Sequence, residues 1–253
     1  MAAAADGRGA AARDARAQAG ARSTRAARAG QRVPPRMTTP RFRSVILDAD
    51  STLAAIEGID WLGALRGPEV AHEIARLTTE AMEGRMSVDA VYAPRLALIA
   101  PTADELEALA RHYIATLVSG ARETVGALHA AGVHVVIVSG GLHRALVPMA
   151  ALLGIAADDV HAVHVRPDAN GAFTLFDGEQ LLATQRGKPT VVRALALPRP
   201  ILAVGDGITD AALRGVDDAT FAAFTGVVRR PAVVAAADHV LSSLTEVLPL
   251  VLP

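Results

Sequence analysis

The sequence predicts an α/β fold, in which a parallel sheet flanked by helices carries a small helical cap inserted after the first strand. Short apolar runs that end in polar turn residues are typical of buried parallel strands, and helical patterns separate most of them. The exception is the stretch from Ile56 to Val118, where about sixty residues of helical pattern follow the first strand directly. That stretch is too long for an ordinary crossover, so we expect it to cover the strand ends.

The chain of 253 residues is long enough for one large domain or for a domain with a smaller cap. We expect residues 41–54 and 120–253 to form the core domain and residues 55–119 to form the cap. Residues 1–40 are rich in Ala and Arg and bury too little apolar surface to fold, so we expect a disordered tail. A basic arm for nucleic acid and a transit-like leader are alternatives. The simplest interpretation is an over-extended start, with Met37 as the initiator.

Charge and composition argue against several classes of protein. Ten arginines and two aspartates give residues 1–43 a charge of +8, which leaves −9 on the rest of the chain. An acidic body lacks the basic face of a nucleic-acid-binding domain. The chain has no cysteine, and no apolar stretch reaches membrane-spanning length. We therefore expect a cytoplasmic protein with no nucleic-acid or membrane partner. We expect a monomer or a homodimer, and the sequence does not decide between the two.

The first half of the chain gives clear starts and stops for its elements. The first strand is expected at about 44–48, and Pro68 and Pro101 stand where helices would begin. Thr102 and Glu105 form a capping-box pattern at one of these starts. A helix is expected over 123–131 with Gly132 as its stop, then a strand over 133–138, and then a helix that runs to Leu153.

The second half resumes the alternation of strand and helix. Asn170-Gly171 lies between two strand-like runs and is a strong hairpin signal. Gly187-Lys188-Pro189 opens a further helix, and a third buried strand is expected over 201–204. Shorter strands near 220–223 and 240–241 complete the predicted sheet.

Polar clusters follow three of the predicted strands: Asp48 and Asp50, Ser139-Gly140-Gly141, and Asp206 with Asp210. The carboxyl ends of parallel strands meet at one edge of a sheet, so we expect the three clusters to lie together. Asp48 and Asp50 are two residues apart and face one side of an extended strand, where they repel unless a cation, a shared proton or a reacting group separates them. Carboxylates for a hard cation, glycine amides for phosphate and a lysine for its charge indicate phosphoryl transfer.

Each cluster alone has an ordinary structural explanation. Asp-x-Asp is usually a strand terminus, Ser-Gly-Gly is usually a helix entry, and Gly-Asp-Gly is a common turn. Lys188 alone would be a solvated side chain, yet it is the only lysine of the chain, which suggests that its compact ammonium is required. The clusters in this order and at strand ends are far more specific than any one of them.

The four motifs resemble those of the haloacid dehalogenase (HAD) superfamily, whose Rossmannoid core and inserted cap match the predicted fold. They read Asp48-x-Asp50-Ser51-Thr52, Ser139-Gly140-Gly141, Lys188 and Gly205-Asp206-Gly207-x-Thr209-Asp210. The predicted cap is similar to that of the phosphoserine phosphatases of this superfamily in Glu57-Gly58-Ile59-Asp60, Ala81-Met82-x-Gly84 and Arg95-Leu96-Ala97-Leu98-Ile99. The resemblance runs from about Ser44 to the C-terminus.

The resemblance implies roles for the motif residues. Asp48 would attack phosphorus and become a phospho-aspartate, while Asp50 would protonate the leaving oxygen and later deprotonate the attacking water. Phosphate would be held by Ser139, Gly140 and Lys188. The implied cofactor is Mg²⁺, with the Asp48 and Asp206 carboxylates and the Asp50 carbonyl as its ligands. Asp210 would lie behind these ligands, to orient the site or to pair with Lys188.

The resemblance also implies a substrate, O-phosphoserine. Glu57 and Arg95 would bind its ammonium and carboxylate groups, and Met82, Gly84 and Thr209 would complete the pocket. Glu83, Val88 and Val227 depart from the residues expected in that family, which leaves the strictness of serine selectivity open. One alternative is a phosphatase of the same fold for another small phosphomonoester. Another is a non-catalytic regulatory protein that binds phosphoserine.

Overall fold

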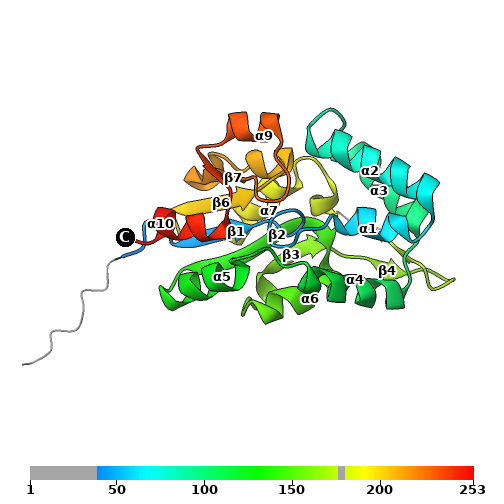
Figure 1. The fold of residues 1–253 in the computed structure, drawn as a ribbon, viewed down its shortest axis with the longest axis horizontal. Coiled ribbons are helices and arrows are strands. Elements are labelled where there is room, and N and C mark those ends of the chain that lie inside the picture. Colours follow the sequence, from blue (N-terminus) through cyan, green and yellow to red (C-terminus); the bar gives the residue numbers. More distant parts are fainter. Residues whose placement is uncertain (1–38, 176–179) are drawn as a thin grey trace, which may run out of the picture. The chain divides into compact units, whose positions relative to one another are not determined.

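The computed structural model describes residues 39–175 and 180–253, so the predicted tail lies outside the described residues except for its last two positions. Its centre is a parallel sheet with the strand order β3-β2-β1-β6-β7-β8, which confirms the predicted fold class (Figure 1). The strands of this sheet are β1 Ser44–Leu47, β2 His134–Leu142, β3 Val160–Val163, β6 Ile201–Gly205, β7 Thr220–Phe224 and β8 His239–Leu241.

The strand order creates a switch point at β1. Leu47 pairs with Ile137 of β2 on one side and with Val204 of β6 on the other. After β1 the chain adds β2 and β3 on one side of that strand and then β6, β7 and β8 on the other side. At such a reversal of strand order a crevice opens at the carboxyl ends of β1, β2 and β6. The sequence places its three polar clusters directly after or within these strands.

β2 is longer than the sequence predicts. It continues through Ser139-Gly140-Gly141 to Leu142, whereas the sequence predicted its end at Val138. Its pairing with β3 shifts register between Val138 and Leu142, so the glycines lie in an irregular part of the strand. The Ser-Gly-Gly cluster is therefore a strand segment, and α6 begins only at His143.

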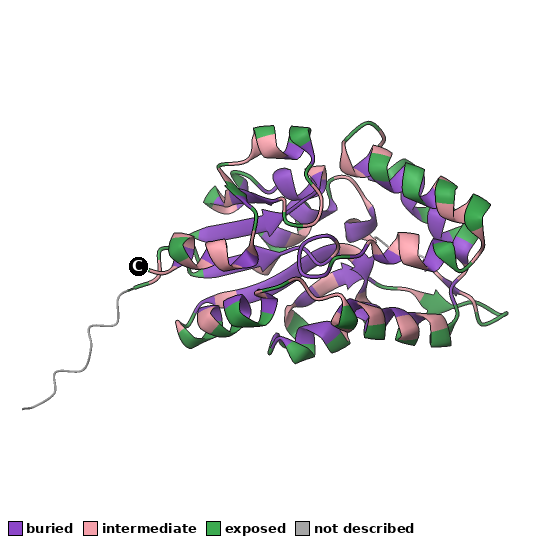
Figure 2. Cartoon of the chain, in the orientation of Figure 1, coloured by how far each residue is buried: buried purple, intermediate pink, exposed green. Residues whose placement is uncertain are grey.

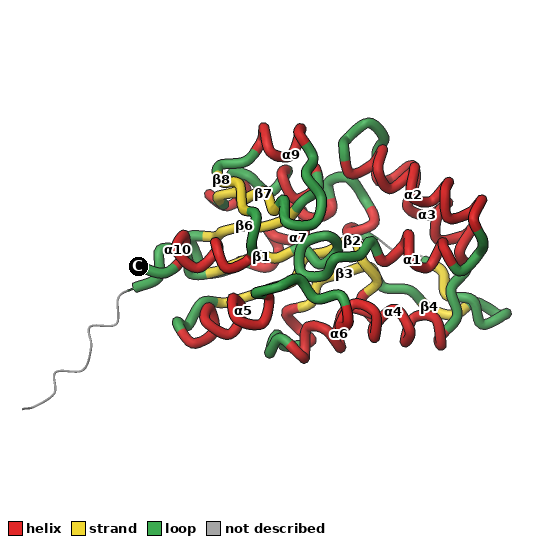
Figure 3. The backbone as a smooth tube through the Cα atoms, in the orientation of Figure 1, coloured by secondary structure: helices red, strands yellow, loops and turns green. Residues whose placement is uncertain are grey.

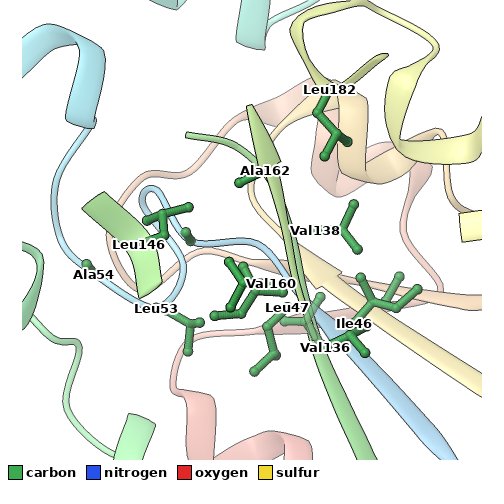
Figure 4. Close-up of a cluster of buried hydrophobic side chains, with 14 of the residues drawn as sticks. Ile46, Leu47, Leu53, Ala54, Val136, Val138, Leu146, Val160, Ala162 and Leu182 are labelled. Carbon is green, nitrogen blue, oxygen red and sulfur yellow. The ribbon is translucent and has the colours of Figure 1, made fainter. Parts of the chain in front are cut away.

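The sheet interior explains why the strands read as continuous apolar runs. All four residues of β1 are buried, and so is nearly all of β2, β6 and β7 (Figure 2). Ile46, Leu47, Val136 and Val138 lie in the buried cluster of Figure 4, together with Leu146 from α6. Helices cover both faces of such a sheet, so both sides of each strand must be apolar. Burying each large aliphatic side chain stabilises the fold by about 1.5–3 kcal/mol.

Helices flank the sheet. In the view of Figure 1, α5 and α6 lie below the strands and α9 lies above them. The α-helices of this part are α5 Ala121–Ala130, α6 His143–Leu152, α7 Gly187–Leu195, α8 Ile208–Ala211, α9 Pro231–Ala236 and α10 Val247–Val251. The 3₁₀ helices are η1 Ala157–Asp159, η2 Leu181–Ala183, η3 Val216–Asp218 and η4 Leu244–Glu246.

Four helices are inserted between β1 and α5, which confirms the predicted insertion (Figure 3). They are α1 Gly58–Ala64, α2 Pro68–Met82, α3 Val88–Ile99 and α4 Ala103–Ala115. Pro68 is the first residue of α2, and Thr102 and Glu105 form the predicted capping box of α4. Helices α1 to α3 pack on one another, while α4 packs mainly along α6. The predicted cap boundaries at residues 55 and 119 stay a prediction.

The predicted hairpin is present beside this insertion. β4 Arg166–Pro167 and β5 Phe173–Thr174 pair in antiparallel fashion, and Gly171 takes the left-handed conformation, with φ of 82°. The Phe173 amide donates to the Pro101 carbonyl at 2.7 Å, which ties the hairpin to the connection between α3 and α4. Within residues 39–175 and 180–253, no helix has the length and apolar character needed to cross a membrane.

Candidate active site

One cavity lies at the carboxyl ends of β1, β2 and β6, with residues of α1, α2 and α3 among those that line it. Most of the predicted site residues line it: Asp48, Asp50, Glu57, Met82, Arg95, Ser139, Gly140, Lys188, Asp206 and Thr209. Two predicted residues do not. Asp210 lies behind Lys188, and Gly84 follows α2 with φ of 76°, beside Ile208. The structure therefore brings ten of the predicted site residues together at one cavity, while their roles stay predictions.

Lys188 joins two of the strand-end aspartates. Its Nζ lies 2.8 Å from Oδ1 of Asp48 and 2.5 Å from Oδ1 of Asp210. All three side chains are buried, and the other Asp210 oxygen accepts the Gly207 amide at 3.0 Å. Burial, followed by the charge of Asp48, raises the pKa of Asp210 to about 7, and Lys188 opposes this shift. The contact with Lys188 fixes one oxygen of Asp48 and orients its carboxylate.

Asp50 is held by two hydrogen bonds. Its Oδ1 accepts hydrogen bonds from the Gly58 amide and from Tyr113 Oη, both at 2.7 Å. Burial, with the charges of Glu57 and Asp48, raises the pKa of Asp50 to about 8. A side chain at Gly141 would begin only 3.0 Å from Oδ2 of Asp50, so the glycine makes room for this carboxyl group. Asp50 is thus largely protonated at neutral pH, as general acid catalysis requires.

The irregular part of β2 presents polar groups to the cavity. Ser139 is fully buried, and its Oγ accepts the Gly141 amide at 3.0 Å, which leaves the hydroxyl proton free to donate. The Gly140 carbonyl accepts the Tyr92 hydroxyl at 2.7 Å. This bond from α3 holds the strand against the inserted helices.

Arg230 connects the acids on the other side of the cavity. One guanidinium nitrogen contacts the Asp206 carboxylate, and Nη2 lies 3.3 Å from Oε1 of Glu57. Thr52 donates to the other Asp206 oxygen at 3.2 Å, and Ser51 donates to Glu57 at 2.8 Å. Arg230 therefore links the acid that follows β6 with the acid at the start of α1.

The acidic residues suit a hard divalent cation. Carboxylate oxygens of Asp48, Asp206 and Asp210 all lie within 4.8 Å of one another, and all three residues are buried. Carboxylate oxygens are the ligands that Mg²⁺ prefers. Both oxygens of Asp210 are engaged, by Lys188 and by the Gly207 amide. Lys188 contacts Oδ1 of Asp48, and Thr52 and Arg230 contact the two oxygens of Asp206, so an ion held by Asp48 and Asp206 would share these carboxylates with the groups already bound to them.

Arg95 lies at the wall formed by the inserted helices. It is only 3% exposed, and its guanidinium carbon lies 5.7 Å from the centre of the Tyr92 ring. Nη1 donates to Thr78 at 2.5 Å. The cavity thus contains one buried arginine on the insertion side and the carboxylate cluster on the sheet side.

Sequence reasoning missed several residues of the site, among them Thr78, which lines the cavity, and Tyr92, Tyr113 and Arg230. The tyrosines carried one signal, because they are the only two in the chain and both contact site residues. Arg230 gave none, since it is one of many arginines and lies outside every motif. Only the fold brings it to Glu57 and Asp206.

The chain is similar to known proteins. A family model of haloacid dehalogenase-like hydrolases matches residues 45–213. The phosphoserine phosphatase of Bos taurus is 33% identical over 208 residues, which span 81% of this chain and 91% of that protein.

Solved structures are similar as well. A phosphoserine phosphohydrolase-like protein from Francisella tularensis matches with a TM-score of 0.76 and 26% identity, over 83% of this chain and all of that one. A phospho-aspartyl intermediate analogue of a phosphoserine phosphatase matches with a TM-score of 0.67 and 26% identity, over 82% of this chain and 97% of that one.

Proposed function

The chain belongs to the haloacid dehalogenase-like hydrolase family as one of its phosphatases, and we propose that it hydrolyses O-phospho-L-serine to L-serine and phosphate. The observation that carries this proposal is one cavity that holds the Asp48 cluster, a buried arginine and Glu57. Arg95 suits the substrate's carboxylate, because a guanidinium can donate two parallel hydrogen bonds to it. Glu57 suits the ammonium group by charge.

The proposed reaction begins at Asp48. Lys188 holds one of its oxygens, and the other is the nucleophile that attacks phosphorus to give a phospho-aspartate. Ser139, the Gly140 amide and Lys188 bind the phosphoryl oxygens. The relative solved as a phospho-aspartyl intermediate analogue supports this step by similarity.

Asp50 moves the protons in this scheme. Its raised pKa, about 8, keeps it protonated at neutral pH, so it can give its proton to the serine oxygen as that oxygen leaves. The resulting carboxylate then takes a proton from the water that hydrolyses the phospho-aspartate. Tyr113 and the Gly58 amide keep the carboxyl group in place in both steps.

The carboxylates of Asp48 and Asp206 and the Asp50 carbonyl would hold Mg²⁺, which when bound neutralises charge on the phosphoryl group. We also propose that α1 to α3, within the predicted cap of residues 55–119, form the wall that selects the serine part of the substrate. The cytoplasmic location and the monomeric or dimeric state stay proposals.

The test is phosphate release from O-phospho-L-serine and a panel of other phosphomonoesters, with Mg²⁺ or with EDTA, by the wild type and Asp48→Asn. We expect metal-dependent release that prefers phosphoserine and is lost in the variant. Release from other esters alone would keep the chemistry and reject the substrate. No release from any ester would favour the non-catalytic binding protein.

A further inference from the structure

Three helices of the insertion meet at the guanidinium of Arg95. Arg95 comes from α3, Thr78 from α2 and Asp60 from α1. Nη1 of Arg95 donates to Thr78 Oγ1 at 2.5 Å, and the same hydroxyl donates to Oδ1 of Asp60. The side chains form a chain of hydrogen bonds that begins at the cavity and ends in the helices behind it.

We propose that Thr78 and Asp60 are positioning residues that orient Arg95 toward the substrate's carboxylate and thereby set the preference for substrates that carry one. The proposal rests on the proposed function, in which Arg95 binds that carboxylate. It adds two residues that act through Arg95 rather than on the reacting atoms.

The direction of the hydrogen bonds supports this role. A hydroxyl has one proton to donate, and Asp60 accepts it, so the lone pairs of Thr78 are left to face Arg95. Asp60 thus fixes the rotation of the hydroxyl, and the hydroxyl fixes one end of the guanidinium. Without Asp60 the hydroxyl could turn its proton toward Arg95, where it would repel the cation.

The remaining contacts of Arg95 leave one nitrogen of its guanidinium group, Nη2, available for a ligand. Nε makes a long hydrogen bond of 3.4 Å to the Val91 carbonyl, and the Tyr92 ring lies alongside. Among the described residues, Nη2 has no hydrogen-bond partner. Arg95 and Thr78 are 3% and 4% exposed, so their geometry is set by packing. A fixed arginine loses less conformational freedom when it binds a ligand.

The test compares two substrates that differ in one group. O-phospho-L-serine carries the carboxylate, and O-phosphoethanolamine lacks it, so their difference isolates the group that Arg95 binds. The ethanolamine ester is measured as a substrate and also as a competitive inhibitor, so that slow turnover still gives an affinity. Kinetics are recorded for the wild type, Thr78→Val, Thr78→Ser and Asp60→Asn, with thermal unfolding to verify folding.

Thr78→Val is expected to raise KM for phosphoserine about tenfold, as loss of one hydrogen bond to a charged group implies. kcat should stay within about twofold, and the affinity for phosphoethanolamine should not change. Thr78→Ser should restore the wild-type KM because it restores the hydroxyl. Asp60→Asn should move KM in the direction of Thr78→Val. The matched control is Thr79→Val, since Thr79 is the exposed neighbour whose hydroxyl bonds only within its own helix, to the Ala75 carbonyl.

Equal effects of Thr78→Val on both esters would overturn the inference, because they would indicate a structural role. A wild-type KM in Thr78→Val would overturn it as well. Arg95→Ala separates this inference from the proposed function. If Arg95→Ala removes the preference for phosphoserine and Thr78→Val does not, only the positioning role fails. If Arg95→Ala leaves the preference intact, the proposed substrate contact itself fails.

Discussion

Lys188 is the buried cation that organises two acidic side chains of the site. Burial alone would lower the pKa of Lys188, but the charges of Asp210 and Asp48 raise it above its usual value. The ammonium is a compact point charge that reaches both carboxylates, at 2.8 Å and 2.5 Å. Every other basic residue of the chain except the histidines is an arginine, and we therefore expect this position to need an amine rather than any positive charge.

Replacement of Lys188 by Arg keeps the charge and is nevertheless expected to lower kcat for phosphoserine by about 10²–10³-fold, the loss typical of one misplaced electrostatic donor. We expect the planar guanidinium to be too broad for the space between Asp48 and Asp210 and so to displace Asp48, the proposed nucleophile. Steady-state kinetics measure the loss. Arg186→Lys, two residues earlier and exposed, is the matched control and should leave kcat unchanged. Wild-type kcat in Lys188→Arg would show that charge alone is needed.

Among single residues of the site, those that belong to a sequence motif could be predicted, and those outside every motif were missed. Asp48, Ser139 and Asp206 could be placed because each lies within or next to a recognisable buried strand and parallel strands share an edge. Arg230 could not, because its partners Glu57 and Asp206 are 173 and 24 residues away and no local pattern encodes that meeting. Its position depends on how the chain packs after β7.

Individual helices of the insertion are tied together at their ends. Arg66, just after α1, donates two hydrogen bonds of 2.7 Å to Glu105 at the start of α4 and one of 2.7 Å to the Ile99 carbonyl at the end of α3. Glu105 also closes the capping box with Thr102. The hydrogen bonds from Arg66 lower the pKa of Glu105 to about 2. One ion pair therefore fixes the ends of three helices.

Glu105→Gln is expected to lower the free energy of unfolding at pH 7 by about 1 kcal/mol, because glutamine keeps the capping box but loses the ion pair. The folded pKa of Glu105 lies below the unfolded value, so its contribution is complete above about pH 5 and is lost as the pH falls toward 2. Denaturant unfolding from pH 7 to pH 3 should show the two curves converging.

Glu107→Gln is the control on the same helix. Its side chain is exposed and lies 3.7 Å from Arg144, so little change is expected at any pH. A difference between Glu105→Gln and the wild type that stays constant with pH would assign the effect to packing instead of ionisation.

Helix α3 receives its N-terminal cap from another part of the chain. Ser87 makes no capping bond to this helix, and the Val88 amide instead donates to the Gln185 side chain at 3.2 Å. The backbone N–H of Gln185 in turn donates to the Asp89 carboxylate at 2.9 Å. The connection before α7 therefore holds the start of the helix that carries Tyr92 and Arg95.

Gln185→Leu should speed hydrogen exchange of the amides in the first turn of α3 by about fivefold, since a lost cap costs about 1 kcal/mol. Exchange monitored by mass spectrometry measures this directly. Gln180→Leu is the matched control, because that side chain accepts from the His164 amide rather than from α3. Unchanged exchange in Gln185→Leu would show that packing alone holds the helix start.

The boundaries of elements could be predicted where a residue has one clear local role. Pro68, Thr102 and Gly132 mark two helix starts and one stop because each is suited to few other backbone positions. The end of β2 was predicted wrongly, since Ser139-Gly140-Gly141 fits a helix entry equally well by local preference. Pairing with the neighbouring strands decides that case, and pairing is not local.

At the scale of the whole molecule, the sheet brings together acids that lie far apart in the sequence. Asp48, Asp50, Glu57, Asp206 and Asp210 surround one cavity or lie directly behind it, with Lys188 and Arg230 as the cations in contact with them. The described fold therefore crowds five carboxyl groups together at this point, and the crowding shows in the raised pKa values of Asp50, about 8, and of Asp210, about 7. Such an arrangement costs stability until a cation balances it.

Mg²⁺ is therefore expected to stabilise the folded protein, not only to support catalysis. At a concentration one hundred times its dissociation constant, a ligand that binds only the folded state contributes about 2.7 kcal/mol. For a domain of this size that corresponds to a rise in Tm of about 5–10 °C, measured by calorimetry with Mg²⁺ against EDTA. Asp206→Asn should lose most of the rise, because it removes one of the two carboxylates proposed to hold the ion.

Asp158→Asn is the control for this measurement, since Asp158 is an exposed acid in η1 and outside the acidic cluster. It should keep the full rise in Tm. An equal rise in Asp206→Asn would mean that Mg²⁺ acts on the surface or at another site. If Mg²⁺ does not raise the wild-type Tm at all, the contacts of Lys188 and Arg230 already balance the cluster, and the proposed ion would bind only together with the phosphoryl group.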